Sequence, residues 1–85
     1  MKGTAALLLA IRQTARAEGV EEALLAEWRE SLPQLESRLD AAARSAERKG
    51  WRWVGEMEEI AATFAAAGQP DGFHCAAAEV FRRGQ

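Results

Sequence analysis

Two short stretches hold the residue types that could carry chemistry. Residues 51–60, WRWVGEMEEI, place two tryptophans, a glycine and three carboxylates within ten positions, and residues 74–75 join the chain's single histidine to its single cysteine. Aromatic rings beside paired acids are typical of a glycosidase or another ligand cleft. Histidine and cysteine are nucleophiles and metal ligands. Either chemistry requires that the surrounding elements bring these groups to one face.

The carboxylates of the first stretch are expected to lie on a solvent-exposed face of a helix. Glu56 and Glu59 are three residues apart and share one helical face, where Arg52 is placed to pair with Glu56 four residues later. Met57 and Ile60 fall on the opposite, apolar stripe. The spacing therefore predicts a solvated, ion-paired face, with a catalytic acid pair as the alternative.

The histidine and cysteine are poorly placed to act together. Adjacent helical residues do not face each other, and only Glu79, four residues after Cys75, could join them. A zinc site needs three or four protein ligands. We therefore expect no metal and no cysteine nucleophile, with Cys75 buried or half-buried and His74 in the first turn of the last helix.

A third candidate is a basic ridge of Arg44, Arg48 and Arg52, spaced by four beside the tryptophans. Cations next to aromatic rings are a feature of nucleic-acid binders. Glutamates at 47, 56, 58 and 59 surround this ridge, and 11 basic against 13 acidic residues give a net charge of −2. Such a balance creates no strong field for nucleic acid or an anionic membrane. We expect neither partner.

The elements that must position these residues are helices, because Ala, Leu, Glu and Arg dominate the chain. Thr4 is the expected cap of a first helix that ends at Gly19, and a second starts near Val20. Pro33 ends the second helix or starts a third. Residues 49–50 permit a break or a bend before the next.

The C-terminal part continues the pattern. A helix bearing Trp53 and Met57 should end at Gly68, and Asp71 is the expected N-cap of a last helix. The fold class predicted is an all-α bundle of about five helices.

The first predicted helix is unusual because residues 5–11, AALLLAI, are apolar on every side. Such a helix should be buried all round, either at the centre of the bundle or against a second subunit or another domain. Gly55 is expected to let another helix approach closely. The interface candidates are Leu7, Leu8, Leu9, Ile11, Trp28, Trp53, Met57 and Phe64.

The length of 85 residues corresponds to one domain, which buries only about 60–65% of its unfolded surface. No stretch reaches the ~20 apolar residues of a membrane span. One cysteine forms no internal disulfide, so the expected location is the cytoplasm.

Read in order, KGTAALLLAIR, AEGVEEALLAEW and WRWVGEMEEIAATFAAAGQPDGFHCAAAEVFRR resemble a known helical domain. It is the C-terminal domain of a bacterial subgroup of β-hydroxyacid dehydrogenases, relatives of 6-phosphogluconate and 3-hydroxyisobutyrate dehydrogenases. The resemblance covers residues 2–83 and is most specific over 51–81.

In that family a Rossmann domain binds NAD or NADP, and a long helix bearing the catalytic lysine leads into the helical domain, which closes over the substrate and forms the dimer. The resemblance places that lysine before Met1 and gives Lys2, in the KGT motif, a later position without a catalytic role. The chain has no GxGxxG fingerprint. The resemblance therefore implies that no residue of this chain is catalytic or binds a cofactor or a metal. It also implies that the partner is a second copy of the chain or a Rossmann domain. The alternative is a free-standing adaptor that binds a protein through an exposed tryptophan patch.

Overall fold

The structure is a computed structural model that describes residues 2–84. Four helices follow one another: α1 (Lys2–Glu18), α2 (Glu21–Ser31), α3 (Gln34–Ala66) and α4 (Gly72–Arg83). No strand occurs in these residues. The all-α prediction is confirmed, with one helix fewer than expected.

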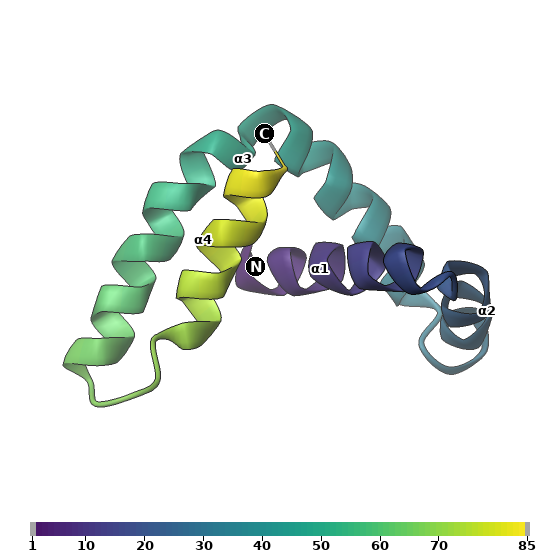
Figure 1. Ribbon diagram of the computed structural model, residues 1–85, viewed down its shortest axis with the longest axis horizontal. Helices are drawn as coiled ribbons and strands as arrows, with labels where there is room; N and C mark the ends of the chain where they lie inside the picture. Colours follow the sequence, from purple (N-terminus) through teal and green to yellow (C-terminus); the bar gives the residue numbers. More distant parts are fainter. Residues whose placement is uncertain (1, 85) are drawn as a thin grey trace.

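The missing boundary lies within α3, which spans 33 residues without a break. A straight helix of that length would be about 50 Å long, whereas the longest dimension of the molecule is 39 Å. Figure 1 shows how α3 fits, because it rises, bends and descends as an arch. A break at residues 49–50 is thus wrong, because the buried Gly50 lies in a continuous helix, whereas the alternative of a bend agrees with the arched course of α3.

The other helices lie beneath the arch (Figure 1). α4 returns along the second limb of α3, α1 crosses below, and α2 packs at the far end of α1 and the start of α3. α1 contacts all three other helices. The first helix therefore packs against every other helix, but the expected burial on all sides is wrong, because Leu7 in its apolar run is 60% exposed.

Two apolar clusters meet α1 on different faces. Ala6 enters one with Trp53 and Phe81, whose rings meet edge to face with centroids 5.1 Å apart. Leu8 enters the other, with Trp28 and Leu39. Because residues two apart point to opposite sides of a helix, the AALLLAI run supplies both clusters.

The helix ends confirm the predicted positions of Gly19, Gly68 and Asp71 and correct that of Thr4. Gly19 and Gly68 have φ of 72° and 78°, the left-handed geometry that glycine adopts at little cost. Thr4 does not cap α1, because that helix already includes Lys2. Asp71 stands at the N-cap of α4, but its backbone is α-helical and its side chain makes no capping hydrogen bond.

Candidate functional site: an apolar groove between α1 and α4

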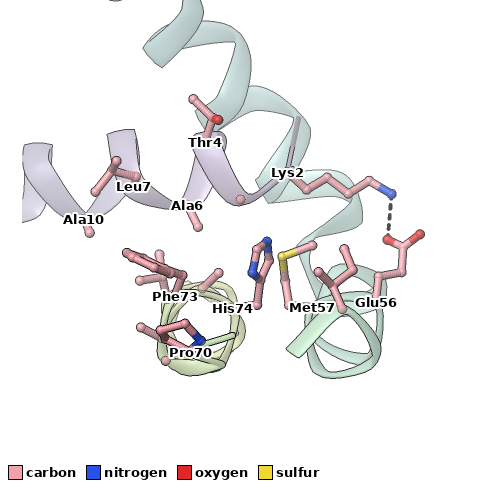
Figure 2. A pocket seen from close by; sticks show the side chains of 16 residues that line it. Lys2, Thr4, Ala6, Leu7, Ala10, Glu56, Met57, Pro70, Phe73 and His74 are labelled. Atoms are coloured by element: carbon pink, nitrogen blue, oxygen red, sulfur yellow. Dashed lines mark hydrogen bonds and ion pairs between the residues drawn. The ribbon is translucent and has the colours of Figure 1, made fainter. Parts of the chain in front are cut away.

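An open groove of about 850 Å³ lies where the start of α1 faces α4 and the second limb of α3. Figure 2 shows Ala6, Leu7 and Ala10 on α1 opposite Phe73 and His74 on α4. Most other lining groups are also apolar, among them Met57, Ile60, Ala76, Ala77 and Val80. Concave apolar surfaces of this volume are where proteins bind ligands or partners.

Two large side chains at the groove are more exposed than any core residue. Phe73 is 73% exposed and Leu7 is 60% exposed. Phe73 lies at the edge of the stripe that α4 buries through Ala77 and Phe81. Leu7 lies between the faces of α1 that bury Ala6 and Leu8. The fold therefore leaves a contiguous apolar surface open to solvent.

One end of the groove is polar. Lys2 Nζ donates to Glu56 Oε2 at 2.6 Å and lies 5.4 Å from the centroid of the Trp53 ring. Figure 2 shows this pair spanning from α1 to α3. Glu56 therefore pairs with Lys2, and the predicted partner Arg52 instead lies over the ring of Trp51 at 6.0 Å.

His74 is held where three helices meet. Its ring packs against Phe64 of α3 with centroids 4.7 Å apart, and its Nε2 would lie 3.1 Å from a Cβ placed on Gly3 of α1. Its buried Nδ1 has no hydrogen-bond partner among the described residues. The imidazole is thus a packing group at the groove wall, in the first turn of α4 as predicted.

The structure disperses the remaining candidates for chemistry. Glu56 pairs with Lys2, and Glu59, the other member of the expected acidic face, is exposed. Glu58 between them pairs with Arg82 of α4 at 3.0 Å. Cys75 is exposed, contrary to the expected burial, because it lies on the face of α4 opposite Ala77 and Phe81. Among residues 2–84 no three His, Cys, Asp or Glu side chains group as metal ligands.

The interface candidates fall into different environments. Leu8, Trp28, Trp53 and Met57 are buried within the chain, and Leu9, Ile11 and Phe64 are half-buried. Leu7 alone of the eight is exposed. Gly55 is also exposed, and a Cβ there would meet nothing within 4 Å, so the expected close helix approach at Gly55 is wrong.

Sequence reasoning missed Phe73. Its distance of four and eight residues from Ala77 and Phe81 suggests the same stripe, but 100° per residue moves it progressively toward the edge. Which edge of this stripe remains open to solvent depends on where α1 lies.

Within residues 2–84, no helix combines the length and apolarity that a membrane crossing requires.

Electrostatic effects on the surface are local. Hydrogen bonds from Arg29 lower the pKa of Glu36, and hydrogen bonds from Arg83 and Arg82 lower the pKa of Glu79. The arginines are exposed and the two glutamates are half-buried, so every one of these ion pairs is open to water. They stabilise local geometry and lie outside the groove.

The family DUF1932, described as a domain of unknown function, matches residues 15–84. Neither the curated proteins nor the solved structures give a significant match. Because the matched segment includes α2, α3, α4 and the end of α1, the chain belongs to the DUF1932 family.

Proposed function

We propose that this chain is the C-terminal helical domain of an NAD(P)-dependent β-hydroxyacid dehydrogenase-like protein. In this role it supplies dimer contacts and part of the substrate pocket, and it is not catalytic by itself. The resemblance supports this assignment, since its most specific block, residues 51–81, lies within the segment matched by DUF1932. An all-helical fold is what the resemblance implies.

The observation that carries the proposal is the open apolar groove with Phe73 and Leu7 exposed beside it. A compact monomer of 9.3 kDa would expose about 5,000 Å². The chain exposes 5757 Å². The excess, roughly 800 Å², is similar to what one partner buries in a standard interface. We assign this surface to contact with a second copy of the chain.

The groove offers little for catalysis alone. Its titratable groups are Lys2, Glu56 and His74, and the first two neutralise each other at 2.6 Å. The chain has no glycine-rich turn after a strand to hold the pyrophosphate of NAD or NADP. Cofactor binding and proton transfer would therefore belong to the Rossmann domain and joining helix of the parent protein.

Sedimentation equilibrium across the micromolar range tests the dimer. We expect a monomer–dimer equilibrium that Phe73→Ser shifts to monomer, because the exposed ring is lost from the groove. Leu32→Ser removes an exposed apolar side chain outside the groove and is the matched control, expected to remain dimeric. A wild-type chain that stays monomeric throughout this range contradicts the dimer assignment.

The dehydrogenase assignment has a separate test. An antibody raised against residues 21–84 should detect, in cells that express the gene, a polypeptide several times larger than 9.3 kDa. Mass spectrometry of that band should identify peptides from the sequence that precedes residue 1, including one with a GxGxxG fingerprint. Detection of the 9.3 kDa chain alone counts against a parent dehydrogenase and favours a free-standing domain.

A further inference from the structure

The outer side of the α3 arch carries basic residues that the rest of the molecule leaves unpaired. Every ion pair within residues 2–84 uses Lys2, Arg16, Arg29, Arg82 or Arg83 as its cation. The exposed Arg44, Arg48 and Arg52 form none. We name the surface formed by these three arginines and Trp51 the arginine ridge.

Helical geometry puts the arginine ridge on one face. Its members recur at spacings of three or four residues, so successive side chains lie one turn apart on the same side. The residues that α3 buries in this region, Ala42, Gly50 and Trp53, lie on the opposite side. Because the other helices lie beneath the arch (Figure 1), the ridge faces away from them.

The segment that forms the arginine ridge differs in net charge from the rest of the chain. Residues 44–52 contain four basic residues and one acid, Glu47, a net charge of +3, whereas the whole chain has −2. The remainder therefore carries −5. An overall balance that predicts no polyanion partner thus conceals a short cationic stretch, bounded by the exposed acids Asp40 and Glu59, which complements an acidic segment of similar length.

Trp51 adds an apolar anchor to this surface. It is 64% exposed, whereas Trp28 and Trp53 are 9% and 8% exposed. Gly55, one turn further on, presents no side chain, and the space around its Cβ position is empty. This open space beside the indole can accept a partner's side chain. Tryptophan and arginine are the residues most enriched at energetic centres of protein interfaces.

We propose that the arginine ridge binds an acidic α-helix of another protein. Arginines at four-residue spacing repeat about every 6 Å along α3, and glutamates at four-residue spacing on a partner helix repeat at the same distance. An extended acidic strand would need a sheet edge to satisfy its backbone, which an all-helical surface does not offer. Nucleic acid is disfavoured because one exposed indole gives a single stacking position.

This surface and the groove lie on different faces of α3, so the proposal does not rest on the dehydrogenase assignment. The probe is a synthetic alanine-based helical peptide with glutamates at every fourth position. A peptide of the same composition, with its glutamates distributed around the helix, is the matched control. Emission of the exposed Trp51 is the readout, and Trp51→Phe identifies the signal that comes from it.

We expect the regularly spaced peptide to shift the emission to shorter wavelength in a saturable, salt-sensitive manner. Arg48→Glu, at the centre of the ridge, should weaken binding at least tenfold. Arg38→Glu makes the same change of charge on α3 at an exposed residue that lines a hollow facing α1, and should weaken binding less than threefold.

Several results would overturn the proposal. One is an unchanged emission spectrum at millimolar peptide and low salt. A second is equal binding of the two peptides, and a third is equal weakening by Arg38→Glu and Arg48→Glu. Tighter binding of an oligothymidylate that displaces the peptide would assign the ridge to nucleic acid, and self-association abolished by Arg48→Glu would assign it to a second copy.

Discussion

Gly3 of α1 lies directly against His74 of α4, so that a Cβ on Gly3 would come within 3.1 Å of Nε2. The imidazole is supported from behind by Phe64, with ring centroids 4.7 Å apart. The absent side chain of Gly3 therefore sets how closely α1 and α4 approach at the end of the groove.

Gly3→Ala should destabilise the chain by about 1 kcal/mol, because the overlap must be relieved by a shift of the ring or of α1. Gly55→Ala is the matched control, since its Cβ meets nothing within 4 Å, and it should stabilise by about 0.5–1 kcal/mol through helix propensity. Urea denaturation monitored by circular dichroism measures both. If Gly3→Ala stabilises as much as Gly55→Ala, the contact with His74 has no energetic effect.

Truncation of the two phenylalanines on α4 should change the free energy of unfolding by very different amounts. Phe81 is 2% exposed and Phe73 is 73% exposed, so Phe81→Ala should cost about 3–5 kcal/mol of unfolding free energy, whereas Phe73→Ala should change it by less than about 0.5 kcal/mol. Thermal unfolding at a concentration below dimer formation separates the two. A large loss for Phe73→Ala under these conditions would mean that its ring packs within the monomer.

Stability should fall in acid. Hydrogen bonds from Arg29, and from Arg83 and Arg82, lower the pKa of Glu36 and of Glu79 below the usual value. Folding then favours their ionised forms, so this contribution is complete above about pH 4.3 and is lost as the pH falls through the lowered pKa values. The contribution is small because both carboxylates keep contact with water, which screens their ion pairs.

Unfolding midpoints measured between about pH 6 and pH 3 test this expectation. The double variant Glu36→Gln, Glu79→Gln should show a weaker dependence on pH than the wild-type chain. Parallel curves for the two proteins would indicate that other carboxylates govern the acid sensitivity.

Tryptophan fluorescence should show one solvent-exposed indole and two buried ones. Trp51 is 64% exposed while Trp28 and Trp53 are buried. Trp51→Phe should shift the emission maximum to shorter wavelength and reduce quenching by acrylamide. Trp28→Phe should leave the exposed component in place, and loss of that component would place Trp51 in a contact that the isolated chain does not show.

The sequence by itself determined the helical class and most helix ends. Composition and helical spacing predicted the buried stripe through Trp53 and Met57, because this periodicity is a local property of the chain. The helix ends at Gly19 and Gly68 could also be predicted, since a residue without a Cβ adopts the left-handed geometry that ends a helix at little cost. The resemblance at residues 51–81 also required only the order of residues.

Only the tertiary structure decided which apolar surface stays open. Helical spacing fixes the direction in which each side chain leaves its own helix. Whether a side chain in that direction is buried depends on where the neighbouring helices lie. α1 buries Ala6 and Leu8 and leaves Leu7 exposed, and α4 leaves Phe73 outside its contact with α3. The same reason accounts for Glu56, because its partner is Lys2, 54 residues away, and no local rule could find a contact made by the packing of α1 against α3.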